Sequence, residues 1–324
     1  MSRRNIGQLK DGEKVEEIYR ISDKQLRSNK NGNLYLQFNL SDRTGVMSGR
    51  LWNIGEDTYS QLEGEEYVLA DCTTQRFQGV LQLIAKKLTK IDPKTINVKD
   101  FVRTTPIDIP KLLARLKEIG MSITNGDLRN LADCFLIDEQ FMAKFAKAPA
   151  GVKLHHAYPG GLLDHSVQMM EVAVRIASLY SQLNRDLLVI GAFLHDIGKT
   201  EEMRYETDVH YSSEGQLLGH PLLGIELLHD KIREAEKLSG QPFDPELAMT
   251  LKHLLISHHG TYENQSAKLP MTLEAMTLHF IDSIDSKIAE FQKYMDEDAN
   301  IGSPWTSYIP AIERKLFKGS EPQS

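Results

Sequence analysis

The sequence lacks any apolar run that approaches the roughly 20 residues needed to cross a bilayer. The basic residues near its start are not followed by a hydrophobic segment, so the pattern of a secretory signal is missing as well. We therefore expect a cytoplasmic protein that makes no contact with a membrane.

Cysteine is also scarce, because Cys72 and Cys134 are the only two in 324 residues. They lie far apart in the sequence, and neither belongs to a Cys-x-x-Cys motif. This spacing argues against a disulfide framework and against a thiolate zinc site. We expect both residues to be reduced, structural thiols.

A basic net charge, which would favour a nucleic-acid partner, is missing too, since the formal net charge is -7. The charge is nevertheless distributed unevenly. Residues 1–90 have 14 Lys and Arg against 12 Asp and Glu, a balance of +2, which leaves -9 for residues 91–324. Divalent ions bound in the acidic part would offset some of that charge locally, so a phosphate substrate is not excluded there.

Residues 1–90 have the pattern of short strands joined by turns. The clearest strand is 34–40, in which four apolar side chains alternate with polar ones and share one face. Further strands are expected at 15–21, 46–52, 66–73 and 80–87. A polar basic loop is expected at 24–32 and a short helix at 54–62. Five strands with a helix between the third and the fourth is the order of an OB-fold barrel.

Residues 91–108 carry Pro93 and Pro106 among charged and β-branched residues, a composition that is typical of a linker. After the linker, apolar residues recur at helical spacing. Helices are expected at 109–119, 127–147, 163–183, 186–197, 218–238, 245–259 and 272–295. We therefore predict an all-α second domain over 109–310, followed by a tail at 311–324.

All eleven histidines lie between His155 and His279. Five of them form, with two aspartates, the order H, HD, H, HH, D along the chain. These residues are His165, His195, Asp196, His220, His258, His259 and Asp282. Imidazole and carboxylate groups bind first-row divalent metals at neutral pH, and a carboxylate between two groups of histidines can bridge a pair of ions. The pattern therefore predicts metal-dependent hydrolysis.

Helical spacing places two of these candidates inside the second domain. His258 continues the apolar positions of helix 245–259, which predicts that its ring points inward. Asp282 and Asp285 share one face of helix 272–295 with small apolar residues, where an uncompensated charge would be costly. Asp285 can equally orient a ligand or pair with a lysine, so we leave it outside the ligand set.

The remaining histidines fit the metal pattern less well, and we expect surface or packing roles for them. They are His155, His156, His210, His229, His253 and His279. The first pair precedes a Tyr-Pro-Gly-Gly segment and could line the entrance of the site.

Residues 155–285 resemble the HD-domain phosphohydrolases, whose signature of H, HD and D this chain matches at His165, His195-Asp196 and Asp282. The additional histidines resemble the branch of that superfamily that binds two metals. Four motifs, after an OB-like domain, are similar to the YhaM-type 3'-5' exoribonucleases, and this resemblance covers nearly the whole chain. They are YPGGLLDHS at 158–166, LHDIGK at 194–199, LGH at 218–220 and ISHHG at 256–260. One departure is Asp164, where that family has Glu in the corresponding segment.

The resemblance implies a multidomain fold in which an N-terminal all-β OB-fold barrel precedes an all-α HD-domain helical bundle. It also implies that Asp196 bridges two divalent ions. One ion would be completed by His165, His195 and Asp282, and the other by His220 and His258, with the role of His259 left open. Mixed imidazole and carboxylate ligation with open positions suits manganese first, with iron, cobalt and nickel as alternatives, better than a closed zinc site.

Two such ions can hold a bridging hydroxide and neutralise charge on a scissile phosphate, which makes Asp196 a catalytic candidate. Lys199 is the second candidate, because it has the reach to touch a non-bridging phosphate oxygen. The alternative for Lys199 is a cation at a helix C-terminus that faces solvent.

The barrel domain carries candidates for binding a single nucleic-acid strand. Polar and aromatic residues on the outward face of two strands could stack bases and contact the backbone. They are Tyr35, Gln37, Arg50 and Trp52. A second set lies in the loops that OB folds use for binding, namely Lys24, Arg27, Lys30, Arg76 and Phe77. The alternative for Trp52 is a packing role at the barrel end.

The predicted function is that of a metal-dependent 3'-5' exonuclease of single-stranded RNA, with DNA as a further substrate, that releases nucleoside 5'-monophosphates. Its polarity and products come from the resemblance alone. The alternative is a phosphohydrolase of small nucleotides, such as a cyclic dinucleotide or a nucleoside polyphosphate, in which the barrel regulates activity. A third class is a non-catalytic single-strand binding protein with a vestigial metal site, against which the complete ligand set argues. The sequence is compatible with a homo-oligomer.

Overall fold

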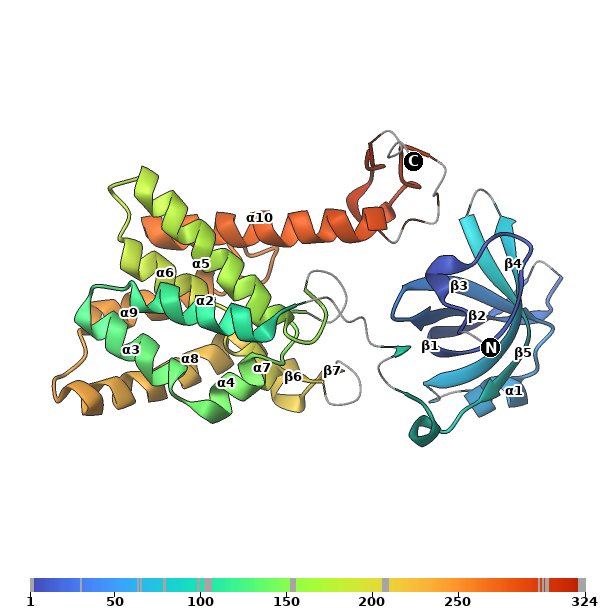
Figure 1. Cartoon of the computed structure of the whole chain (residues 1–324), viewed down its shortest axis with the longest axis horizontal. Helices are drawn as coiled ribbons and strands as arrows, with labels where there is room; N and C mark the ends of the chain where they lie inside the picture. Colours follow the sequence, from blue (N-terminus) through green and yellow to red (C-terminus); the bar gives the residue numbers. More distant parts are fainter. Residues whose placement is uncertain are drawn as a thin grey trace. The chain divides into compact units, whose positions relative to one another are not determined.

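The chain forms two compact units in a computed structural model (Figure 1). The structure describes residues 3–29, 31–62, 64, 66–77, 80–97, 100–101, 107–151, 156–205, 210–296, 298, 300 and 303–319. One unit comprises residues 1–104 with 291–324, and the other comprises residues 105–290. The domain boundaries expected after residues 90, 108 and 310 stay predictions, because contacts within the chain do not show which segment folds on its own.

The first unit contains a closed five-stranded barrel with the strand order β1-β2-β3-β5-β4. The strands are β1 (Lys14–Ser28), β2 (Leu34–Asp42), β3 (Gly45–Trp52), β4 (Tyr67–Phe77) and β5 (Val80–Lys90). Helix α1 (Glu56–Leu62) lies between β3 and β4, and short 3-10 turns lie at Ile6–Gln8, Pro93–Thr95 and Pro310–Ile312. Neighbouring strands are antiparallel except β3 and β5, which are parallel. The predicted barrel with a helix after its third strand is confirmed.

The alternation along β2 builds the centre of the barrel. Leu36, Phe38 and Leu40 are completely or almost completely buried, as their spacing predicts, while Leu34 at the strand end is partly exposed. The same strand pairs with β1 on one side and β3 on the other, so its polar face is held in a fixed register with both neighbours. Burial of large apolar side chains of this kind supplies the main driving force for folding of the barrel.

One segment of the barrel differs from the prediction, since the loop expected at 24–32 begins later. Strand β1 continues to Ser28 after an irregularity between Ser22 and Gln25, and its second half pairs with the start of β2. The sequence of this half is polar because most of its side chains are exposed, so it lacks the alternating apolar pattern from which a strand is predicted. Lys24 and Arg27 therefore lie on a strand and not in a loop.

The second unit is helical, as predicted, apart from a hairpin of two very short strands, β6 (Met203–Arg204) and β7 (His210–Tyr211). Its helices are α2 (Ile109–Met121), α3 (Gly126–Leu136), α4 (Glu139–Phe145), α5 (Gly161–Leu179), α6 (Arg185–Leu194), α7 (Lys199–Glu202), α8 (Ser213–Ser239), α9 (Pro245–Ser257) and α10 (Leu273–Asp296). Within the described ranges, no helix is both long and apolar enough to cross a membrane.

Two helices differ from their predicted bounds for a local reason. The helix expected at 127–147 is two helices, because Asp138 caps the start of α4 by accepting a hydrogen bond from the backbone N–H of Phe141. Helix α8 begins at Ser213, where Ser212 caps it, and is interrupted at Gly219 by non-helical φ and ψ angles. In both cases the residue that caps the helix sets where it starts, and the apolar spacing alone does not reveal that position.

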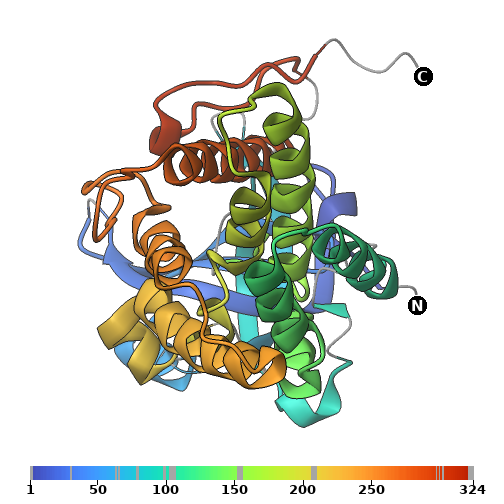
Figure 2. The same cartoon turned by 90° about the vertical axis from the view of Figure 1, so that its left-hand side faces the viewer.

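Helix α6 lies at the centre of the helical unit, with α5, α9 and α10 around it (Figure 2). Every residue from Asp186 to Leu194 is buried, which is the pattern of a helix enclosed on all sides. Phe193 packs edge-to-face against Phe135 and Phe145. The chain leaves this helix directly into His195 and Asp196, so the core fixes the position of both residues.

Candidate metal centre and nucleic-acid face

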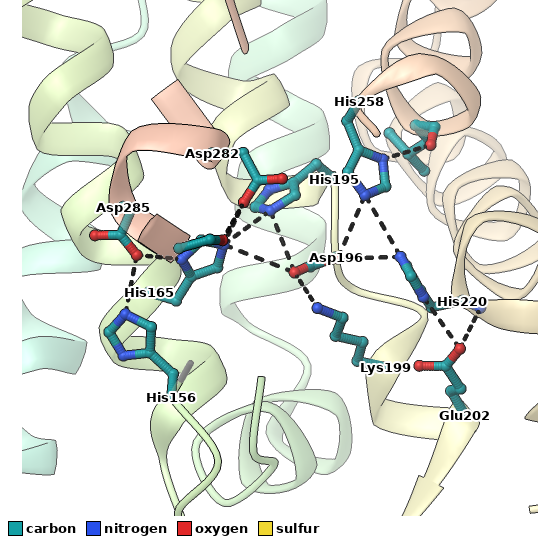
Figure 3. A network of polar contacts seen from close by, with 12 residues as sticks. His156, His165, His195, Asp196, Lys199, Glu202, His220, His258, Asp282 and Asp285 are labelled. Carbon is teal, nitrogen blue, oxygen red and sulfur yellow. Dashed lines mark hydrogen bonds and ion pairs between the residues drawn. The ribbon is translucent and has the colours of Figure 1, made fainter. Parts of the chain in front are cut away.

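The side chains of the predicted ligand set meet in the interior of the helical unit, and Figure 3 labels all of them except His259. Five helices bring them together. His165 lies on α5, His195 and Asp196 follow α6, His220 follows the break in α8, His258 and His259 follow α9, and Asp282 lies on α10. Residues that are 117 positions apart in the sequence thus become neighbours.

The first group consists of His165, His195 and Asp282, whose ligand atoms lie within 4.8 Å of one another. The Nε2 atom of His165 is 3.1 Å from Nε2 of His195 and 3.4 Å from Oδ1 of Asp282. Both imidazole rings are buried, and the carboxylate is largely buried. This group has the composition of a divalent metal site.

The second group consists of His220, His258 and His259, again with ligand atoms within 4.8 Å. The Nε2 atoms of His220 and His258 are 3.4 Å apart. The His259 ring lies 4.2 Å from the ring of His258 and 5.1 Å from that of His220, measured between centroids. The structure therefore brings His259 into the second group, although the sequence left its role open.

Asp196 lies between the two groups and presents one carboxylate oxygen to each. Its Oδ2 atom is 3.3 Å from Nε2 of His195 and 3.7 Å from Nε2 of His165. Its Oδ1 atom is 3.3 Å from Nε2 of His220 and 3.6 Å from Nε2 of His258. Oδ1 is buried and has no hydrogen-bond partner among the described residues. An anionic atom in this position requires compensation by a cation.

The tautomers of the histidines test whether a cation fits. The Nδ1 atoms of His195 and His258 donate to the carbonyl oxygens of Ala192 and Leu255, at 3.0 and 2.7 Å. Because Nδ1 carries the proton, the Nε2 atom of each neutral ring presents a lone pair to the centre. Several lone pairs and an unpartnered carboxylate oxygen then face one another in a buried space, and this arrangement fits divalent metal.

The pKa shifts of Asp196, Asp282 and His258 suit such a ligand set. Burial acts to raise the pKa of Asp196, but Lys199 and His195 outweigh it and hold that pKa well below its usual value. Burial similarly opposes ionisation of Asp282, and His165 lowers its pKa strongly. Burial, together with His259, holds the pKa of His258 far below its usual value. The centre thus combines ionised carboxylates with a neutral imidazole, the forms that bind metal. Asp282 and Asp285, in contrast, outweigh burial and raise the pKa of His165 to about 9, so a metal ion would have to displace a proton from that ring.

Lys199 does not face solvent, and the alternative of a helix C-terminal cation is wrong. It is the first residue of α7, its side chain is 11% exposed, and its Nζ atom lies 2.6 Å from Oδ2 of Asp196. Burial acts to lower the pKa of Lys199, yet Asp196 raises it above the usual value. The ammonium group is therefore a fixed positive charge at the edge of the centre.

Gly198 allows this short segment to approach the second group. A Cβ atom on Gly198 would lie 2.0 Å from the carbonyl oxygen of His220, which is closer than two atoms can be without displacement. The Asp-Ile-Gly-Lys sequence therefore requires glycine at this position so that Asp196 and His220 can share one site.

Two supporting acids were missed or left open by the sequence. Asp285 accepts a hydrogen bond from Nδ1 of His165 at 2.7 Å and does not pair with a lysine among the described residues. Glu202 accepts from both the backbone N–H and Nδ1 of His220, at 3.0 and 3.1 Å. Each carboxylate orients a histidine of one of the two groups. Asp285 could be found from its place one turn after Asp282, whereas Glu202 had no signal in the sequence.

For His156 a surface or packing role was expected, with the entrance of the site as a further option, and the structure shows it buried. Its Nε2 atom lies 2.9 Å from Oδ2 of Asp285, and its Nδ1 atom lies 2.7 Å from the hydroxyl of Tyr158. That hydroxyl donates to Asp164 at 2.8 Å. A chain of hydrogen bonds therefore runs from the helix start at Asp164 to His165. His155 lies outside the described residues.

The barrel brings some of its candidate residues together. The Tyr35 and Trp52 rings lie on paired positions of β2 and β3, with centroids 4.8 Å apart. Gln37 pairs with Arg50 two residues further along, on the same face of the sheet. The Arg50 guanidinium carbon lies 5.8 Å from the Trp52 ring and 5.7 Å from the Phe77 ring. Trp52 is 39% exposed, so it is not a buried plug. Aromatic and guanidinium groups arranged in this way can stack bases.

The register also places Arg27 beside this face, because it pairs with Tyr35 across β1 and β2, and its guanidinium donates to Gln25 on its own strand. Lys24 donates to the carbonyl oxygen of Leu62. Arg76 and Phe77 lie at the end of β4 and not in a loop, because β4 continues in register with β5 to Phe77. Lys30 lies outside the described residues.

Comparison with known proteins gives consistent matches. Residues 162–287 match the model of the HD domain. The chain is 31% identical to the 3'-5' exoribonuclease YhaM of Geobacillus sp., over 94% of this chain and 92% of that protein. The protein of the same name from Bacillus subtilis is 30% identical over 94% and 95% of the two chains. That of Shouchella clausii is 33% identical over 84% and 82%.

Proposed function

This chain belongs to the YhaM family of 3'-5' exoribonucleases, and we propose that it is a metal-dependent enzyme that shortens single-stranded RNA from the 3' end and releases nucleoside 5'-monophosphates. The class of reaction is hydrolysis of a phosphodiester bond. DNA is proposed as a further substrate.

The observation that carries the proposal is the position of Asp196 between two groups of histidines. Its Oδ2 side faces His165, His195 and Asp282, and its Oδ1 side faces the second group. We assign one divalent ion to each side, with Asp196 shared, and manganese as the first choice before iron, cobalt and nickel. Such ions supply a water of lowered pKa and neutralise charge on the scissile phosphate.

The chain's own residues hold this chemistry in place. Lys199 is poised to contact a non-bridging oxygen of the phosphate, since its charge is fixed beside Asp196. Asp285 and Glu202 hold the rings of His165 and His220 with their Nε2 atoms toward the centre. Ligands that are held in this way need little reorganisation when the substrate binds.

The aromatic face of the barrel supports an RNA substrate. Tyr35, Trp52, Arg50 and Phe77 form a cluster that suits stacking with unpaired bases and requires no particular sequence. We propose that this cluster holds the body of a single strand while the helical unit hydrolyses its end. The salt dependence of binding would then be modest, because two guanidinium groups, those of Arg50 and of Arg27 beside Tyr35, are available for phosphates on this face.

The direct test is the variant Asp196→Ala on a 20-nucleotide RNA labelled at its 5' end, with manganese present. We expect loss of the descending ladder of products by a factor of at least about 1,000, because both ions lose a ligand. Asp133→Ala is the matched control, since Asp133 pairs with Arg129 on the surface of the same unit. Full activity of Asp196→Ala would contradict the proposal. Release of phosphate from mononucleotides with no shortening of RNA would favour a small-nucleotide phosphohydrolase.

A further inference from the structure

A cavity of about 320 Å³ lies beside the second group of histidines and has no role so far. Two lining residues place it next to the metal centre. Gly219 directly precedes His220 in the chain, and Glu202 accepts a hydrogen bond from the backbone N–H of His220. The other described residues that line it are Tyr211, Gly215, Gln216, Leu217, Leu218 and Gln265. Its volume is at the lower end of the range for small-molecule sites.

The cavity lies where helix α8 is broken. Gly219 has φ 72° and ψ 158°, a conformation that only glycine adopts readily, and a new helical segment begins beyond it with Pro221 near its start. The break turns His220 toward Asp196 and leaves Leu217 and Leu218 exposed, at 84% and 44%. The same feature of the sequence therefore forms both a metal ligand and the wall of the cavity.

Glu202 lines this cavity and holds His220 through one of its two carboxylate oxygens. Its Oε1 atom accepts both hydrogen bonds from His220, whereas Oε2 has no partner among the described residues. The side chain is only 10% exposed, and the residue lines the cavity. An ionised carboxylate can accept hydrogen bonds but cannot donate them. A ligand in the cavity is therefore expected to place a hydroxyl or an amino group at Oε2.

The other residues that line the cavity indicate the chemical class of its ligand. No lysine or arginine is found among the described residues around the cavity, and its one charge is negative, so a phosphate group is disfavoured inside it. Two glutamine amides and a tyrosine ring suit the polar edge and the flat face of a base, and the exposed leucines offer apolar contact. Carboxylates bind ribose hydroxyls in other nucleotide sites for the same reason.

We propose that this cavity binds the nucleoside part of the 3'-terminal nucleotide, with Glu202 accepting hydrogen bonds from the ribose hydroxyls. The inference rests on the proposed function and adds the determinant of sugar specificity to it. Glu202 and Asp196 lie on opposite edges of the His220 ring, at Nδ1 and Nε2. A nucleoside in the cavity would direct its 5'-phosphate past this ring to Asp196 and Lys199. Only an RNA end offers a free 2'-hydroxyl there, so ribose is preferred over deoxyribose.

The variant Glu202→Gln tests the role of Oε2, because the amide oxygen can still accept the two bonds from His220 while the amide nitrogen replaces the second acceptor. The substrates are a 20-nucleotide RNA and the same RNA with one 2'-deoxynucleotide at its 3' end. We expect the native protein to favour the ribose end in kcat/KM by about tenfold or more, and the variant to lose most of this preference.

The ratio between the two substrates separates sugar recognition from an effect on the metal. Equal losses on both substrates would mean that Glu202 acts only through His220, and this result would overturn the proposal, as would a native protein without preference. Titration of adenosine 5'-monophosphate and its 2'-deoxy analogue into manganese-containing protein gives a readout without turnover. We expect tighter binding of the ribonucleotide, and no difference for Glu202→Gln.

Tyr211→Ala tests the base contact without touching His220. We expect a KM for RNA that is raised about fivefold or more, with manganese affinity unchanged, and little effect on an RNA whose terminal nucleotide lacks a base. Tyr180→Ala is the matched control, because Tyr180 is also exposed and follows α5 in the same unit. A KM equal to that of the control would overturn the base contact. If Asp196→Ala abolishes shortening in either case, the proposed function stands independently of the cavity.

Discussion

At the scale of single residues, the protonation state of His156 follows from which of its hydrogen-bond partners can donate a proton. The single hydroxyl proton of Tyr158 is donated to Asp164, so its oxygen must accept from Nδ1 of His156. Asp285, an ionised acceptor, must receive the proton on Nε2 of the same ring. His156 is therefore doubly protonated and carries a positive charge between two carboxylates. Because this charge partly neutralises Asp285, it weakens the hydrogen bond that Asp285 accepts from Nδ1 of His165.

The first prediction concerns Asp285, which fixes the ring of His165. For Asp285→Asn we expect the ion on the side of His165 to bind about 10- to 100-fold more weakly, while the ion near His220 is retained. Calorimetric titration with manganese, combined with metal analysis after dialysis, measures both sites. Asp186→Asn is the control, because it removes a buried carboxylate far from the ligand set. Equal weakening at both sites would show a general loss of structure instead of a loss of orientation.

The sequence could predict which side chains meet at the centre but not the residues that hold them in place. His258 and Asp282 were found because each extends a periodic pattern of a long helix, and periodicity depends on local sequence alone. His156 could not be found in this way, since its backbone has a positive φ of 45° in an irregular segment. The role of Glu202 depends on a helix that begins eleven residues later. Contacts of this kind are set by tertiary packing and have no local signal.

At the scale of elements, Asp186 ties the start of α6 to the segment between α2 and α3. One of its oxygens accepts from the backbone N–H groups of Thr124 and Asn125 and from the Thr124 hydroxyl, at 2.7 to 2.9 Å. Burial acts to raise the pKa of Asp186, but these hydrogen bonds outweigh it and lower the pKa. The ionised form is therefore the one that stabilises the fold.

The second prediction follows from the sign of this shift. Because the folded pKa lies below the unfolded value of about 3.9, the carboxylate stabilises the protein above pH 4, and this contribution is lost as the pH falls through the folded pKa. We expect Asp186→Asn to lower the free energy of unfolding at pH 7 by about 1–3 kcal/mol and to flatten its decline below pH 4. Urea unfolding at several pH values measures both. If the free energy of unfolding of the variant declined as steeply below pH 4 as that of the native protein, the stabilising role of ionised Asp186 would be contradicted.

Elements were predictable where one pattern dominated. The alternation of β2 and the order of strands around α1 were sufficient for the barrel, and the apolar spacing from residue 109 onward was sufficient for a helical unit. The errors arose where a polar segment belongs to a regular element, as in the second half of β1, or where a cap divides a helix, as at Asp138. Backbone pairing and capping decide such boundaries, and the apolar pattern does not report them.

At the scale of the whole molecule, the proposed division of labour separates strand binding from hydrolysis. The third prediction is that Trp52→Ala weakens binding of a 20-nucleotide RNA by about 5- to 100-fold, because a stacked base is worth about 1–3 kcal/mol. Cleavage of a dinucleotide should not change, since a dinucleotide needs only the helical unit. Fluorescence anisotropy and a product assay measure these two quantities.

Trp305→Ala is the matched control for this variant. Trp305 is 48% exposed and lies 5.0 Å from Phe317, much as Trp52 lies against Tyr35, but it is outside the barrel strands. Loss of dinucleotide cleavage in Trp52→Ala, or equal effects of the two tryptophans on RNA binding, would refute the division between the units.

The complete enclosure of α6 has a practical consequence for anyone who wishes to redesign this enzyme. No position between Asp186 and Leu194 offers a solvent-facing site at which a substitution would be harmless. A new metal preference would therefore have to be engineered from the proposed ligands on or directly after α5, α8, α9 and α10, with α6 left as the fixed scaffold.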